Sequence, residues 1–123
     1  MVLSIQSLTD EHRQIEAALD SFAGSIGFGT INIEAFRCVH ELCVRHYEHE
    51  TVLLVRLGDR DASLAAKLEG QHNEVLEIAY HLLEAETRGQ TADTLYLARR
   101  FLAIARHNMI EEERDVFPLV TEG

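Results

Sequence analysis

Apolar side chains recur every three or four positions along almost the whole chain, and this spacing restricts the fold more than any other feature. It is typical of amphipathic helices, and no segment alternates polar and apolar residues over the length of a strand. Breaks at 24–29 (GSIGFG), 58–61 (GDRD) and 87–93 (TRGQTAD) divide the pattern. The helices are therefore expected from Ser7, Thr9 or Asp10 to the GSIGFG break, from about 32 to 57, from Asp61 or Ser63 to about 86, and from Thr91 or Asp93 to about 116. This predicts an all-α fold, an antiparallel up-down-up-down four-helix bundle in which residues 1–123 form a single domain.

Charge and composition exclude several classes of function. The formal net charge is −10 and no cluster of lysine or arginine is present, so nucleic acid and anionic membranes are poor partners. No apolar run approaches the roughly 18 residues that span a bilayer, and the N-terminus has no secretory pattern, which predicts a cytoplasmic protein. Cys38 and Cys43 lie about 140° apart around a helix, so we expect free thiols and no disulfide between them.

The segment RHYEHETVLL (45–54) places histidines and glutamates at the approach to an apolar run. At about 100° per residue, His46 lies on the same stripe as its apolar neighbours, and Glu50 lies about 40° from it. Glu48 falls on the opposite side, and His49 lies at the boundary. His46 and Glu50 are therefore predicted to face the bundle interior. There they require either a hydrogen bond with each other or a metal ion, because unpaired buried polar groups are costly.

The other helices favour the metal. His12 and His72 lie on the apolar stripes of the first and third helices, and His107 and Glu111 repeat in the fourth helix the spacing of His46 and Glu50. That spacing puts both side chains on one face, one turn apart. The sequence thus predicts one inward histidine on each helix and a metal site formed by the following residues: His12, His46, Glu50, His72, His107 and Glu111. Glu16 is expected to be exposed, and Tyr47 is a weaker candidate ligand.

These segments resemble the hemerythrin-like (HHE cation-binding) domain family over essentially the whole chain. The resemblance is carried by DEHRQI, HYEHE, QHNEV and HNMIEEERDVFPLV, of which the last is the most specific. It implies a non-haem di-iron centre with an oxo or hydroxo bridge. Glu50 and Glu111 would bridge the irons, and the four histidines would be terminal ligands. Imidazole and carboxylate ligands alone would also admit manganese or zinc.

One departure bears on function. Oxygen-carrying members of the family have a second histidine four residues after the first on the third helix, where this chain has Leu76. The sequence is instead similar to members with four histidines and two glutamates. This favours redox chemistry with O₂, peroxide or nitric oxide, including catalase-like peroxide decomposition in oxidative or nitrosative stress, with no catalytic residue identified. The alternatives are a non-enzymatic oxygen or iron binding or sensing protein and a metal-free helical adaptor. A homodimer is compatible with the sequence.

A ferritin-like site is disfavoured, because it needs an E-x-x-H motif on two helices. Only Glu69 and His72 match that motif here.

Overall fold

The computed structural model describes residues 4–26 and 29–121, and nearly all of these residues are helical. The elements follow in the order α1 (Ile5–Gly24), α2 (Ile33–His49), α3 (Thr51–Arg60), α4 (Ala62–Thr87), α5 (Thr91–Glu111), the π-helix η1 (Glu112–Val116) and α6 (Phe117–Thr121). The prediction of an all-α fold is confirmed for this part of the chain. Gly27, in the first predicted break, lies outside the described residues.

The helix starts agree only in part with the predicted caps. Asp61 caps α4 as predicted, since its side chain accepts a hydrogen bond from the backbone N–H of Leu64. The cap of α1 is Ser4, not one of the three predicted residues, and its side chain accepts from the Ser7 N–H. The turn between α4 and α5 contains Gly89 at φ 72°, a conformation that glycine adopts without steric cost.

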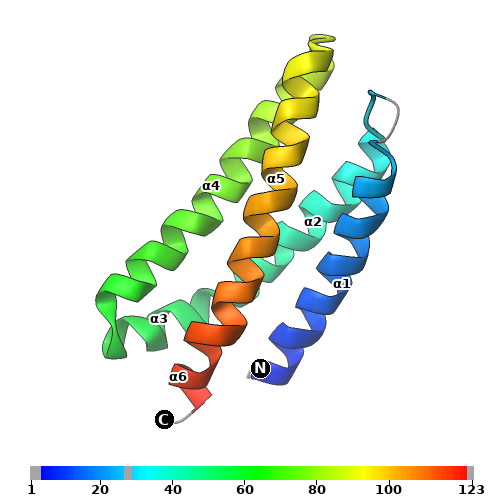
Figure 1. Ribbon diagram of the computed structural model, residues 1–123. Coiled ribbons are helices and arrows are strands. Elements are labelled where there is room, and N and C mark those ends of the chain that lie inside the picture. Colours follow the sequence, from blue (N-terminus) through cyan, green and yellow to red (C-terminus); the bar gives the residue numbers. More distant parts are fainter. Residues whose placement is uncertain (1–3, 27–28, 122–123) are drawn as a thin grey trace.

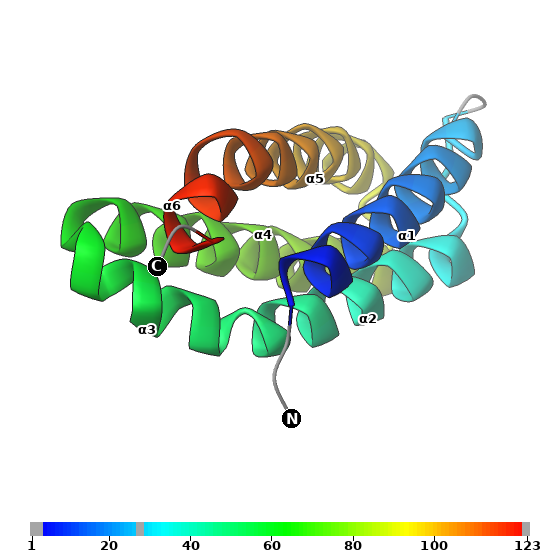
Figure 2. The same ribbon diagram turned by 90° about the horizontal axis from the view of Figure 1, so that it is seen from below.

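Figure 1 shows α1, α2, α4 and α5 as long rods, with the chain reversing direction between successive rods. Seen from below in Figure 2, α3 continues from α2 towards the start of α4, and α6 follows α5. None of the described helices is long and apolar enough to cross a bilayer.

The segment predicted as one helix from about 32 to 57 is two helices in the structure. α2 ends at His49, α3 begins at Thr51, and Glu50 lies between them with φ −78° and ψ −3°. The inward stripe continues across this junction, because Cys43, His46, Glu50 and Leu53 are all buried. The junction therefore changes the path of the chain without turning Glu50 away from the interior.

The core consists of two apolar clusters. The larger includes Ile15, Cys43, Val75 and Met109, and the smaller includes Leu8, Leu53, Leu68 and Val116. Buried polar residues lie along the chain between members of the two clusters: His12 on α1, His46 on α2 with Glu50 at the junction to α3, His72 on α4, and Glu112 directly after α5. The fold thus encloses a polar layer between two apolar regions.

Candidate metal centre

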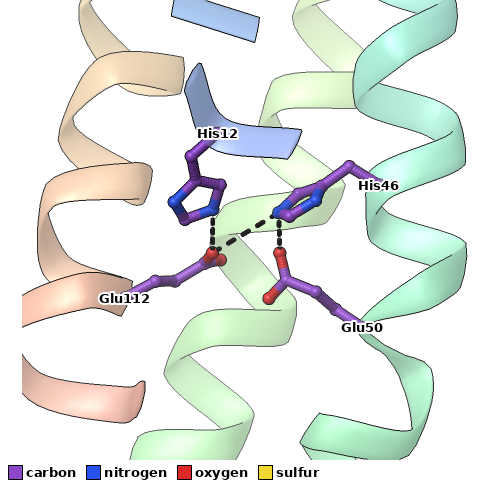
Figure 3. A group of neighbouring side chains, drawn as sticks. All are labelled: His12, His46, Glu50 and Glu112. Atoms are coloured by element: carbon purple, nitrogen blue, oxygen red, sulfur yellow. Dashed lines mark hydrogen bonds and ion pairs between the residues drawn. The ribbon is translucent and has the colours of Figure 1, made fainter. Parts of the chain in front are cut away.

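The polar layer is a compact group of imidazoles and carboxylates. His12, His46, Glu50 and Glu112 each offer a donor atom, and these atoms all lie within 4.8 Å of one another (Figure 3). His72 joins them, since its Nε2 lies 2.7 Å from Glu112 Oε2. We refer to these five residues as the His/Glu cluster. All five are buried, the most exposed being His72 at 4%.

Within each of the two carboxylates, the two oxygens face different imidazoles. Glu112 Oε1 lies 2.9 Å from His12 Nε2 and 3.7 Å from His46 Nε2, whereas Glu112 Oε2 lies beside His72. Glu50 repeats this arrangement, with Oε1 in close contact with His46 Nε2 and Oε2 3.9 Å from His72 Nε2. One oxygen of each carboxylate therefore faces His46, and the other faces His72; the Glu112 oxygen on the His46 side also faces His12.

Two further carboxylates contact the Nδ1 atoms of His12 and His46, which lie on the side of each ring away from the cluster. Glu11 Oε1 lies 2.6 Å from His46 Nδ1, and Glu113 Oε2 lies 2.7 Å from His12 Nδ1. An ionised carboxylate only accepts hydrogen bonds, so each Nδ1 carries the proton and donates it. When the imidazole is neutral, its Nε2 lone pair is then directed into the cluster, as a metal-binding histidine requires.

Burial and proximity shift the protonation of the cluster. Burial raises the pKa of Glu50 to about 7, with His46 acting against this shift and Glu112 adding to it. Burial also acts to raise the pKa of Glu112, but the imidazoles of His12, His46 and His72 outweigh it and hold that pKa well below its usual range. Burial disfavours the imidazolium of His46, yet the carboxylates of Glu112 and Glu50 raise its pKa to about 10. Positive charge is thus strongly favoured at the centre of the cluster.

The donor set fits a metal ion. His46 Nε2 and both carboxylate oxygens of Glu50 are buried, and apart from the contact of His46 Nε2 with Glu50 Oε1 they have no hydrogen-bond partner among the described residues. Buried polar atoms are normally satisfied, and a cation coordinated by these atoms would satisfy them. Imidazole nitrogen with carboxylate oxygen suits manganese, iron and zinc. The group of His12, His46, Glu50 and Glu112 can therefore hold a metal ion.

The structure brings four of the six predicted ligands together. The inward orientation predicted for His12, His46, His72 and Glu50 is confirmed by their burial. The orientation predicted for His107 is wrong, because its side chain is 66% exposed.

Glu111 is also outside the cluster. Its carboxylate faces Lys67, His107 and Gln71, with Nε2 of Gln71 at 2.6 Å. Glu112, the next residue, takes the place that was predicted for Glu111.

The apolar stripe of α5 contains the signal that identifies Glu112. Ala98, Phe101, Ala105, Asn108, Glu112 and Val116 follow a spacing of three or four residues and are all buried. Asn108 lies on this stripe and His107 directly precedes it in the chain. The His107 side chain is therefore rotated by about 100° from the inward direction. The predicted pair relied on the spacing between His107 and Glu111, which places the two side chains together but not on the inward face.

Three other residues near the cluster are now placed. His49 Nδ1 lies 2.6 Å from Glu11 Oε2, so this half-buried histidine shares the carboxylate that contacts His46. The ring of Tyr47 stacks on His72 with a centroid distance of 4.0 Å. Glu16, predicted to be exposed, is partly buried and pairs with Arg13 at 2.9 Å.

Comparisons of the chain with protein-family models, with curated protein sequences and with solved structures gave no match.

Proposed function

We propose that this chain is a hemerythrin-like four-helix protein whose His/Glu cluster binds two non-haem iron ions. The observation that carries the proposal is the orientation of Glu50 and Glu112, each with one oxygen facing His46 and the other facing His72. A carboxylate that bridges two metal ions presents its oxygens in this way. The first position would be held by His12, His46 and one oxygen of each carboxylate, and the second by His72 and the remaining oxygens.

Burial restricts the ligands that such a centre can meet. His12 and Glu50 are both 0% exposed, and the apolar clusters cover the centre on two sides. We therefore propose small ligands, namely O₂, hydrogen peroxide or nitric oxide. We also propose that the protein is cytoplasmic. Bound iron would supply redox chemistry and Lewis acidity. The part of the chain itself is to orient the imidazoles through Glu11 and Glu113 and to exclude bulk water.

The proposed reaction is the disproportionation of peroxide during oxidative or nitrosative stress. One molecule of hydrogen peroxide is oxidised to O₂ and gives up two electrons and two protons. A second molecule accepts them and is reduced to two molecules of water. The reaction needs no other oxidant or reductant.

The alternative is a non-enzymatic protein that binds or senses oxygen or iron, and the near-complete burial of the centre favours it, because access is restricted. Oxygen evolution from peroxide separates the two. Rapid evolution by the iron-loaded protein, lost in Glu50→Ala, would support the enzyme. A stable spectral change on adding O₂ or nitric oxide, without peroxide turnover, would support the binding protein.

The ultraviolet–visible spectrum tests the iron centre itself. Iron-loaded protein is expected to show near-ultraviolet charge-transfer bands that disappear in Glu50→Ala and Glu112→Ala. Glu111→Ala is the matched control, because Glu111 faces Lys67 and Gln71 and should leave the bands unchanged. Bands that persist in Glu112→Ala and disappear in Glu111→Ala would contradict the proposed ligands.

A further inference from the structure

Asn108 is a buried polar residue with an unused oxygen. Its side chain is on the inward stripe of α5, only 1% exposed, and its Oδ1 has no hydrogen-bond partner among the described residues. An amide carbonyl buried in this way is uncommon, because an unmatched acceptor costs about 1–3 kcal/mol. A ligand that the oxygen binds would account for it.

The orientation of the Asn108 amide is fixed by a chain of hydrogen bonds. Because the carboxylate of Glu111 can only accept, Gln71 must direct its amide nitrogen at it, and the distance is 2.6 Å. The oxygen of Gln71 is then left for Asn108, whose Nδ2 donates to it over 3.0 Å. Exchanging the nitrogen and oxygen of Asn108 would bring two oxygens together. Oδ1 of Asn108 is therefore not directed at Gln71 and is buried.

Two contacts connect Asn108 to the residues around the second metal position. The backbone N–H of Glu112 donates to the carbonyl oxygen of Asn108, so the two side chains lie one helical turn apart on one face. Gln71, which holds the Asn108 amide, directly precedes His72 in α4. Asn108 thus lies one helical turn from Glu112 and is hydrogen-bonded to the residue that precedes His72.

The second position also has fewer protein ligands than the first. His12 faces Glu112 Oε1 and His46 faces the Oε1 atoms of both carboxylates, whereas among the described residues His72 is the one imidazole that faces the Oε2 atoms. Resting on the proposed function, we propose that Oδ1 of Asn108 is a ligand of the second metal ion. The two positions then differ in chemistry: the first has two imidazoles, and the second has one imidazole and one amide oxygen. The more oxygen-rich second position is suited to harder ions such as Mn²⁺ as well as Fe²⁺.

Anaerobic equilibrium dialysis against Fe²⁺ tests this assignment on the full chain. The wild-type protein is expected to bind two equivalents. Asn108→Leu should retain the first and bind the second at least tenfold more weakly, whereas Asn108→Asp, which keeps an oxygen at this position, should retain both. Thr94→Val is the matched control, because Thr94 is another buried polar residue of α5, 2% exposed and more than three turns from Asn108.

Circular dichroism of each metal-free variant checks that it is folded, and Asn108→Ala replaces the leucine variant if that variant unfolds. Two equivalents bound by the wild type with unchanged affinity in Asn108→Leu or Asn108→Ala would overturn the role of Asn108 and leave the proposed function standing. Fewer than two equivalents in the wild type would overturn both. Loss of the second equivalent in Thr94→Val as well would show a general loss of packing and would also overturn the assignment.

Discussion

Glu111 and Glu112 are neighbours in the chain but have different surroundings. Glu111 contacts Lys67 and Gln71 at the edge of α4, while Glu112 is fully buried and faces three imidazoles. A helical wheel separates adjacent residues by about 100°, so an error in the assumed inward direction is enough to exchange them. The apolar stripe of α5 resolves the choice, and the spacing between His107 and Glu111 does not.

We expect Glu112→Ala to lose bound metal and Glu111→Ala to keep it. Removing Glu112 deletes an oxygen beside His12 and another beside His72, and so weakens both proposed metal positions. Iron per chain after anaerobic reconstitution, measured by plasma emission spectroscopy, is the test. His107→Ala is a second control that should keep the metal, because the His107 side chain is 66% exposed. Metal retained by Glu112→Ala and lost from His107→Ala would restore the ligand set predicted from the sequence.

Glu11 supports metal binding by orienting His46 and is not itself a proposed ligand. We expect Glu11→Gln to weaken metal binding by about 10- to 100-fold, the usual cost of losing a carboxylate that orients a histidine ligand. The Fe²⁺ dissociation constant measures the effect. Glu41→Gln is the matched control, since Glu41 is 73% exposed on α2 and forms an ion pair with Arg45. An equal loss in both variants would indicate a general effect of charge.

At the scale of elements, the sequence predicted the regular helices well and their irregularities poorly. The stripe Leu8, His12, Ile15, Leu19 and Phe22 is buried as predicted in α1. The break at Glu50 and the π-helix after α5 were not predicted. Both preserve the inward face, so the apolar pattern does not reveal them.

The π-helix has a direct consequence for the site. Its wider turn brings residues five apart onto one face, and the N–H of Phe117 donates to the carbonyl of Glu112. Glu112 can therefore face the cluster while Phe117 stacks on His12, with ring centroids 5.4 Å apart. A continuous α-helix would rotate Phe117 away from this contact.

The cap of α4 gives a prediction about stability alone. Asp61→Ala removes the acceptor for the Leu64 N–H and should lower the free energy of unfolding by about 1 kcal/mol. Urea denaturation of the metal-free protein measures the change, and metal content should be unaffected. Asp59→Ala, in the last turn of α3, is the control and should have a smaller effect. An equal loss in the two variants would contradict the capping role.

Over the whole molecule, a polar layer is enclosed between two apolar clusters, and this arrangement makes the stability of the metal-free protein depend on pH. His46 has a folded-state pKa of about 10 against an ordinary value of 6.5. The stability that its protonation contributes is fully present below pH 6.5 and is lost as the pH rises through 10. The raised pKa values of Glu50, about 7, and Cys43, about 12, also favour the protonated folded state and act in the same direction.

We therefore expect the melting temperature of the metal-free protein to fall steadily from about pH 6.5 to about pH 10. Bound metal should reverse the trend across the lower part of this range, because ligands must be deprotonated to coordinate. Differential scanning calorimetry of metal-free and iron-loaded protein measures both. A metal-free melting temperature that rises with pH would contradict the account of the cluster.

The most direct test of the central claim is the number of metal ions bound per folded chain, determined by elemental analysis after anaerobic loading with Fe²⁺ and removal of free metal. If Glu50 and Glu112 bridge two positions, the wild-type protein contains about two iron ions per chain and Glu50→Ala contains fewer. A fully folded wild-type chain that contains no metal after loading would contradict the account, and the His/Glu cluster would then be a metal-free polar core.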